Sequence, residues 1–331
     1  MTSTAINTPA TVEKGSSLWK DAGIRLRRNR AATFSLIILT AIFLACLILP
    51  FIEGLLIDPN ALNLPNKNSP PGGKHLFGTD HLGRDIFSRV LYGGRITIAV
   101  GLITTSVSVT IGVFWGAIAG YAKGFTDDFM MRIVDVLYAL PFLVIVILLG
   151  QTLEPLTSKL TEGSLDLIVG ENASVKEQND TRTWVDPITS LVPLFIAIGA
   201  LSWLTVSRIV RAQVRNVASQ DFVEASRSLG LSHFTILFKH ILPNSLGPII
   251  VYTTLTIPSI MLFEATLSFL GLGVKAPNSS WGILISEGAD RMSANPWLLF
   301  FPSLFFATTL FALNFLGDGL RDALDPKSSK D

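Results

Sequence analysis

Charged residues, cysteines and enzyme motifs are all scarce in this sequence. Asp, Glu, Lys and Arg make up 15% of its 331 residues, whereas a soluble domain carries about 25%. The only cysteine, Cys46, cannot form an internal disulfide, so it does not indicate a redox compartment. The sequence also has no P-loop, Cys-x-x-Cys pair, His-Glu-x-x-His pair or Gly-x-Ser-x-Gly turn. We therefore expect that the chain neither hydrolyses ATP nor acts as an enzyme.

Long apolar stretches are abundant instead. Hydrophobic residues make up 49% of the chain, and the mean hydropathy is +0.50. A helix of 18 or more apolar residues can cross the hydrocarbon core of a bilayer. Six runs of that length contain no Asp, Glu, Lys or Arg: 31–52, 96–122, 136–153, 187–207, 240–263 and 292–317. These runs predict an all-α integral membrane protein with six transmembrane helices and both termini on one side.

The segment before the first apolar run is basic. It carries Lys20, Arg25, Arg27, Arg28 and Arg30. Basic flanks stay in the cytoplasm, which predicts cytoplasmic N- and C-termini. We favour this over a nucleic-acid-binding arm, because the flank lies directly beside a span. With this topology, 16 Lys and Arg residues fall in cytoplasmic segments and 10 in external ones. The first run is too long and too far into the chain for a cleavable signal peptide.

The topology divides the chain into four parts. Residues 1–30 form a cytoplasmic tail with its basic flank, and 31–95 form the first transmembrane helix and an external segment. Residues 96–327 form a five-helix core, and 328–331 a short C-terminal tail. Within the core, 151–187 is an external insertion with seven acidic and three basic residues. We expect it to be variable surface, with contact to an external protein as the alternative.

Four residues of the external segment have side chains that bind metals. They are His75, Asp80, His81 and Asp85. Two histidines and two carboxylates within a short stretch are compatible with a metal site. We favour the alternative, in which the segment is a turn followed by a helix and its charges serve as helix caps and surface pairs.

The second and third apolar runs have patterns that predict packing. Gly112, Gly116 and Gly120 recur every four residues and so share one helix face, which allows another helix to approach closely. Pro141 falls within the third run and predicts a kink. Arg132 and Asp135 precede that run at i and i+3, so the two can pair near the membrane interface.

Two further sets of charged residues border the later spans. Arg208, Arg211 and Arg215 share one helix face after the fourth run. They can anchor in anionic headgroups or meet an acidic partner, and the sequence favours neither. Glu264 is a carboxylate inside the predicted fifth span, Leu246–Phe269. An intramembrane acid marks a possible pathway or interface residue, with pairing near the membrane surface as the alternative.

A polar stretch, Ser219–Asn244, separates the fourth and fifth spans. Asp221 can cap a first short helix, with Glu224 three residues later. Gly230 is expected to end that helix in a left-handed conformation. Ser232 can cap a second short helix, which Pro243 and Asn244 are expected to close. A structured helix pair in a loop of a membrane protein indicates a docking site.

The same stretch resembles the signature loop of the permeases of ABC importers. That pattern is Glu-Ala-Ala, three residues, Gly, nine residues, then Ile-x-Leu-Pro. The matching residues are Glu224, Ala225, Gly230, Leu242 and Pro243, whereas Ser226 and His240 depart from the pattern. The stretches Phe77–Asp85 and Asn314–Lys327 look like those of the C-type subunit in the peptide class.

The resemblance implies a type I ABC importer permease of the dipeptide/oligopeptide class, in a bacterial cytoplasmic membrane. Its partners would be a second, homologous permease, two ATPase subunits and an external binding protein. ATP and Mg would bind to the ATPases, with no cofactor on this chain. Nickel or another small solute is the alternative cargo, and an ion-driven secondary transporter is the alternative class. The cytoplasmic coupling loop would span 207–245. The residues implied in coupling to the ATPases are Asp221, Glu224, Ala225, Ser226, Gly230, Leu242 and Pro243.

Overall fold

The computed structural model describes residues 18–52, 56–169, 192–274 and 278–324. Throughout this part of the chain the regular structure is helical, with two isolated β-bridges in the segment before the third helix. Five helices are long and apolar enough to cross a membrane, or six if one sharply bent pair forms a single span. This agrees with the predicted all-α membrane fold.

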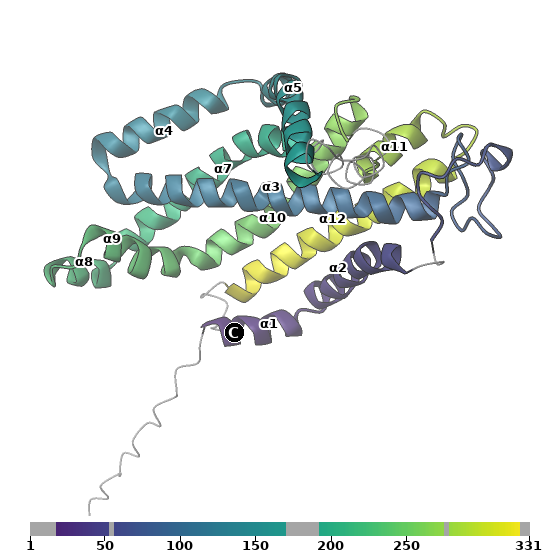
Figure 1. The fold of residues 1–331 in the computed structure, drawn as a ribbon. Helices are drawn as coiled ribbons and strands as arrows, with labels where there is room; N and C mark the ends of the chain where they lie inside the picture. Colours follow the sequence, from purple (N-terminus) through teal and green to yellow (C-terminus); the bar gives the residue numbers. More distant parts are fainter. Residues whose placement is uncertain (1–17, 53–55, 170–191, 275–277, 325–331) are drawn as a thin grey trace, which may run out of the picture.

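The first two helices run along the last one. Helix α1 spans Leu18–Arg28 and α2 spans Arg30–Ile48, with Asn29 between them as the N-cap of α2. Both pack against α12, Trp297–Leu324, as Figure 1 shows. A β-carbon at Gly319 of α12 would lie 2.3 Å from the β-carbon of Ala32, so glycine is needed for this close approach.

Helix α3 is the longest element and runs the length of the bundle (Figure 1). It spans Ile86–Ala122, so it begins ten residues before the charge-free run that predicted it. The short 3-10 turns η1, Leu49–Phe51, and η2, Leu64–Asn66, precede it. Thirty-seven residues extend about 55 Å, well beyond a hydrocarbon core of about 30 Å. Helix α3 is therefore long enough for one or both of its ends to stand outside a membrane.

Helix α7, Val192–Ala218, packs along α3 through the predicted glycine face. A β-carbon at Gly112 would lie 2.6 Å from the Val206 side chain, and one at Gly116 would lie 2.4 Å from the carbonyl oxygen of Ser207. At Gly120 the nearest atom would be the carbonyl oxygen of Arg211, at 2.7 Å. The prediction of a close helix contact on this face is confirmed.

Helices α4, Gly124–Tyr138, and α5, Phe142–Val169, meet at an angle of 85°. The break contains Pro141, so the predicted kink is a sharp bend. Helix α5 continues to Val169, so the first part of the predicted insertion at 151–187 is helical, and its external position stays a prediction. The first charged residue after the third apolar run ends the hydrophobic stretch, but the helix continues beyond it. The remainder of that segment lies outside the described residues.

After α7, the chain continues through helices α8 to α12. Helices α8, Asp221–Ser228, and α9, His233–Thr235, are followed by a π-helical turn η3, Ile236–Ile241, and by α10, Leu242–Phe269. Helix α11, Trp281–Ala289, then precedes α12. In Figure 1, α8 and α9 lie at one end of the bundle and the segment before α3 lies at the other.

Candidate functional site

The candidate site is the hairpin formed by α8, α9 and η3, residues 221–241. The prediction that Asp221 caps α8 is wrong. Gln220 occupies the N-cap position without a side-chain hydrogen bond, and Asp221 is the first residue of the helix. Asp221 and Glu224 thus both lie in the first turn, where their charges complement the positive end of the helix dipole. Both side chains are exposed, so both can contact another molecule.

Gly230 ends α8 as predicted. Its φ of +77° lies in the left-handed region, which glycine adopts without steric cost. Its N–H donates to the Arg227 carbonyl at 2.9 Å, and the Leu231 N–H donates to the Ser226 carbonyl at 3.3 Å. These two bonds form a Schellman motif. The motif reverses the chain after two turns of helix, and it leaves Leu229 80% exposed at the tip.

The second arm of the hairpin does not end where the sequence predicted. Ser232 caps α9 as expected, since its Oγ accepts a hydrogen bond from the Thr235 N–H at 3.2 Å. The helix then continues through η3 into α10 and is not closed by Pro243 and Asn244. Proline cannot donate to the carbonyl four residues earlier. The wider π-helical turn directly before Pro243 carries the helix past it.

The hairpin has an inner and an outer face. Val223, Ile236 and Ile241 are fully buried and belong to one apolar cluster with Val210 and Val214 of α7. Ser226 is also buried, and Leu242 is partly buried. The outer face combines charged with apolar groups. Its exposed residues include Asp221, Phe222, Glu224, Ala225, Arg227, Leu229, Leu231, His233, Phe234 and Lys239, and Pro243 just after the hairpin is exposed as well. The inner face thus fixes the hairpin to the bundle, and the outer face is free for contact.

A polar contact ties the hairpin to the end of α3. The Tyr121 hydroxyl lies 2.8 Å from Nδ1 of His233. The Arg227 guanidinium lies over the same tyrosine ring, 5.5 Å from its centre. This contact was not predictable from the sequence, because its two residues are 112 positions apart. The hairpin therefore contacts α3 as well as α7, and it is continuous with α10.

The arginines after the fourth span pair with α4. Arg211 forms a two-pronged ion pair with the buried Asp127, with distances of 2.5 and 2.7 Å. Arg215 lies 3.7 Å from the same carboxylate. The acidic partner that these arginines meet therefore belongs to the same chain.

Arg208, one turn before Arg211 on α7, forms a further ion pair with α4. It donates to Asp135 at 2.7 Å, and its guanidinium lies 4.2 Å from the centre of the Tyr138 ring. The prediction that Asp135 pairs with Arg132 is therefore wrong. Packing of α4 against α7 brings Arg208 to that carboxylate instead.

Of the four residues considered as metal ligands, all of which precede α3, His75, Asp80 and Asp85 form caps and ion pairs. Asp85 caps α3 by accepting from the Ser88 N–H at 2.8 Å, and it pairs with His75 at 2.9 Å. Asp80 pairs with Arg84 at 2.6 Å and with Arg89 at 3.0 Å. These carboxylates are buried, so the expectation of surface pairs is wrong. Within the described ranges, no three His, Cys, Asp or Glu side chains are grouped to hold a metal.

The charge on Asp80 is stabilised by its partners. Burial acts to raise the pKa of Asp80, but the Arg84 backbone N–H, the charge of Arg89 and the Arg84 side chain outweigh it. The pKa of Asp80 therefore lies below its usual value of 3.8. Arg89 also donates to Glu287 of α11 at 2.8 Å, so this cluster joins the external segment to α11.

Glu264 lies in a closed polar site between helices. It is fully buried in α10. One carboxylate oxygen accepts from Ser268 Oγ at 2.8 Å and from Ser280 Oγ at 2.6 Å. Ser280 also caps α11, because its Oγ accepts from the Ile283 N–H at 3.2 Å. Glu264 therefore holds the start of α11 against α10, and among the described residues it forms no ion pair.

Comparison with known proteins identifies the class. Residues 112–330 match the family model described as "Binding-protein-dependent transport system inner membrane component". The chain belongs to this family of ABC-importer permeases, so it is a multi-pass membrane component and not an enzyme. Residues 17–71 match a second model, described as "N-terminal TM domain of oligopeptide transport permease C".

Individual relatives cover nearly the whole chain. The oligopeptide transport system permease protein OppC of Haemophilus influenzae is 42% identical over 95% of this chain and 90% of its own length. OppC of Bacillus subtilis is 42% identical over 96% of this chain and 92% of its own length. The dipeptide transport system permease protein DppC of Bacillus subtilis is 39% identical over 94% and 86%, respectively. The resemblance found in the sequence is thus confirmed.

Proposed function

We propose that the chain is the C-type permease subunit of a peptide importer in a bacterial cytoplasmic membrane. The printed names of its relatives, which are oligopeptide and dipeptide permeases, support a peptide cargo. The match of the N-terminal 17–71 region to a model of oligopeptide permease C supports the C-type assignment. Such a subunit forms half of the translocation pathway.

Four further subunits complete the proposed transporter. They are a second, homologous permease, two ATPases and an external binding protein. ATP and Mg bind on the ATPases and not on this chain. The external binding protein selects the peptide, and closure of the ATPases drives the two permeases between outward- and inward-facing states.

The observation that carries the proposed mechanism is the two-faced hairpin. Its buried face packs on α7, and its second arm continues without a break into α10. Its exposed face carries Glu224 and Ala225 beside the exposed Phe222 and Leu229. A groove on an ATPase that holds this face would move α7 and α10 together. The coupling residues proposed from the sequence are Asp221, Glu224, Ala225, Ser226, Gly230, Leu242 and Pro243.

The geometry divides these residues by role. Asp221, Glu224, Ala225 and Pro243 are exposed and available to an ATPase, whereas Ser226 is buried on the inner face. The Ser226 Oγ donates to the Phe222 carbonyl at 2.7 Å, so it acts within α8. Gly230 sets the reversal between the two arms, and Leu242 and Pro243 join the hairpin to α10.

The proposed orientation places the hairpin and both termini in the cytoplasm. Gly319 near the end of α12 approaches Leu26 of α1. Gly247 near the start of α10 approaches Leu324, the last residue of α12. The ends of α1 and α12 therefore lie near the hairpin arm that enters α10. The excess of basic residues on the segments at this end supports a cytoplasmic position.

Substitution of the reversal glycine tests the mechanism. Proline fixes φ near −65°, so Gly230→Pro removes the left-handed turn and the Gly230 N–H bond. We expect the variant to insert into the membrane and to lose both peptide uptake and peptide-stimulated ATP hydrolysis.

Gly271 provides a matched control for that variant. It has the same φ of +77°, no neighbour within 4 Å of its virtual β-carbon, and a similar N–H bond to the carbonyl three residues earlier. It follows α10, far from the hairpin. We expect Gly271→Pro to keep ATPase co-purification and stimulation. Wild-type uptake by Gly230→Pro would contradict the proposed coupling role.

A further inference from the structure

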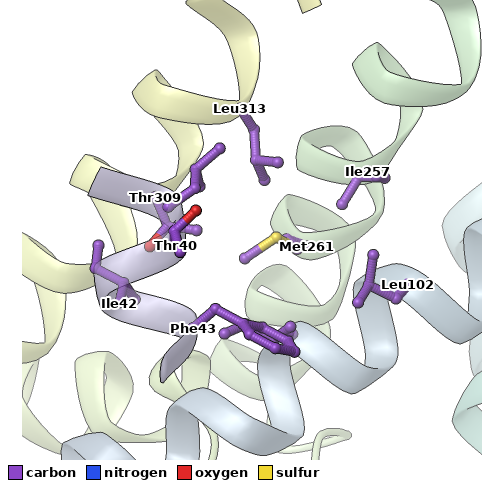
Figure 2. Close-up of a pocket in the computed structure, with 10 residues that line it drawn as sticks. Thr40, Ile42, Phe43, Leu102, Ile257, Met261, Thr309 and Leu313 are labelled. Carbon is purple, nitrogen blue, oxygen red and sulfur yellow. The ribbon is translucent and has the colours of Figure 1, made fainter. Parts of the chain in front are cut away.

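An apolar cavity lies between α2 and the rest of the bundle. It has a volume of about 250 Å³, larger than the cavity of roughly 150 Å³ that binds benzene in another protein. Figure 2 shows Phe43 of α2, Leu102 of α3 and Ile257 of α10 around it, with the Met261 side chain pointing into the space. Helix α12 contributes Thr309 and Leu313 to the lining.

The cavity offers a ligand no free hydrogen-bond donor. Its only hydroxyl groups belong to Thr40 and Thr309. The Thr40 Oγ1 donates to the Leu36 carbonyl at 2.7 Å, and the Thr309 Oγ1 donates to the Phe305 carbonyl at 2.8 Å. Both hydroxyls are thus used within their own helices. A group that fits this cavity is a hydrocarbon, and a polar head would have to remain outside.

Arg95 lies one turn above the cavity on α3. It precedes Ile98 and Leu102, both of which line the cavity, by three and seven residues, so the three share one helix face. Its Nε donates to the Cys46 carbonyl at 2.7 Å and its Nη2 donates to the Leu47 carbonyl at 2.9 Å. These carbonyls belong to the last turn of α2. Arg95 therefore lies beside the C-terminal end of α2.

The charge of Arg95 is not neutralised within the described part of the chain. Its hydrogen-bond acceptors are neutral carbonyls, and none of the ion pairs found there includes it. The aromatic rings of Phe51 and Tyr92 lie 4.5 and 5.0 Å from its guanidinium carbon and stabilise the cation. Its Nη1 forms no hydrogen bond to another described residue, so it remains available to an anion.

We propose that the groove between α2 and α3 is a phospholipid-binding site. One acyl chain fills the cavity, and the phosphate of an anionic headgroup pairs with Arg95. Leu102 lies about 10 Å along the helix from Arg95. A headgroup at Arg95 and an acyl chain at Leu102 would therefore belong to one lipid in one leaflet, with the acyl chain deeper than the headgroup. A bound phospholipid would fill the space that α2 leaves open and would fix this helix to the bundle. The site is separate from the coupling hairpin and does not depend on the cargo.

Native mass spectrometry of the full-length chain in mild detergent tests this site. The chain is titrated with phosphatidylglycerol or with phosphatidylcholine, which has no net charge. We expect one phosphatidylglycerol to bind, about tenfold more tightly than phosphatidylcholine, because of the charge-assisted bond to Arg95. Arg95→Gln keeps a hydrogen-bond donor and should abolish the preference, whereas Arg95→Lys should keep part of it.

A bulky substitution in the cavity tests the acyl-chain part of the site independently of the headgroup part. Leu102→Trp should prevent binding of both lipids. Ile111→Trp on the same helix, at a residue that does not line the cavity, should leave binding unchanged. Arg132→Gln serves as the matched control for removal of a positive charge.

Two results would overturn the proposal. One is equal lipid binding by wild type, Arg95→Gln and Leu102→Trp, which would indicate only lipids that surround any membrane protein. The other is a Leu102→Trp chain that binds lipid normally but no longer assembles with its transport partners, which would show that a protein segment fills the groove.

Discussion

The Tyr121 hydroxyl and the His233 imidazole, 2.8 Å apart, join the end of α3 to the hairpin. This bond lies beside the Arg227 guanidinium, which covers the same ring. Apart from them, the hairpin is held mainly by apolar contacts with α7. The polar contact therefore adds a directional link between the hairpin and α3 to this apolar packing.

Removal of the Tyr121 hydroxyl should weaken coupling more than stability. Tyr121→Phe deletes a partly exposed hydrogen bond, which contributes about 0.5–1 kcal/mol. We expect a small decrease in the thermal midpoint and a several-fold decrease in peptide-stimulated ATP hydrolysis by the reconstituted transporter. Tyr252→Phe is the control, because its hydroxyl has no hydrogen-bond partner among the described residues. Equal activity of the two variants would argue against a directional role for the bond.

The ion pairs between α4 and α7 predict a large difference between two neighbouring acids. Asp127 is buried between Arg211 and Arg215, whereas Asp128 is exposed. Asp127→Asn leaves two arginines without their carboxylate and should cost about 2–3 kcal/mol. Asp128→Asn should change stability by less than about 0.5 kcal/mol. Thermal unfolding of the purified chain compares them, and similar midpoints for both variants would contradict the assigned pairing.

The contact between α3 and α7 predicts that a single methyl group is disruptive at Gly116. A β-carbon there would lie 2.4 Å from the Ser207 carbonyl oxygen, part of the backbone of α7. Gly116→Ala should therefore push the helices apart and destabilise the protein by about 1–3 kcal/mol. Gly150→Ala in α5 meets nothing within 4 Å and should be neutral or stabilising. A fully stable Gly116→Ala protein would exclude the close approach.

The buried charge of Asp80 predicts a dependence of stability on pH. Its folded-state pKa lies below the usual 3.8, which the unfolded chain retains. The resulting stabilisation is therefore present above that value and is lost as the pH falls through the folded-state pKa.

Unfolding measurements between about pH 5 and about pH 3 check this sign. Asp80→Asn should be less stable than wild type at the upper end, and the difference should shrink at the lower end. Asp58→Asn, at an exposed position of the same segment, is the control. A difference between Asp80→Asn and wild type that grows as the pH falls would contradict the assignment.

Local chemistry made parts of the hairpin predictable from sequence. Gly230 and Ser232 act through their own backbone or through hydrogen bonds three to five residues away, and both were predicted correctly. The prediction that Pro243 ends the second helix was wrong. Proline usually ends a helix, and the π-helical turn that lets this helix continue has no comparable sequence signal. Asp221 was predicted as the N-cap of α8, but Gln220 occupies that position and Asp221 is the first residue of the helix.

Contacts between distant segments were not predictable in the same way. Asp127 and Arg211 are 84 residues apart, and only the close packing of α3, α4 and α7 brings them together. The absence of charge likewise located the spans but not the helix ends. Helix α3 begins at Ile86, before its apolar run, and α5 continues to Val169, after its own. Helices need no hydrophobic composition beyond the apolar runs, so the runs did not predict these ends.

The most direct test of the central claim reverses the charge on the exposed face of the hairpin. The complete transporter is reconstituted in proteoliposomes, and ATP hydrolysis and peptide uptake are measured together for Glu224→Lys and for Asp290→Lys, an exposed acid after α11. We expect Glu224→Lys to assemble in the membrane but to lose peptide uptake and the stimulation of ATP hydrolysis by peptide, while Asp290→Lys keeps both. Wild-type uptake and stimulation by Glu224→Lys would contradict the claim that this hairpin transmits the work of the ATPases.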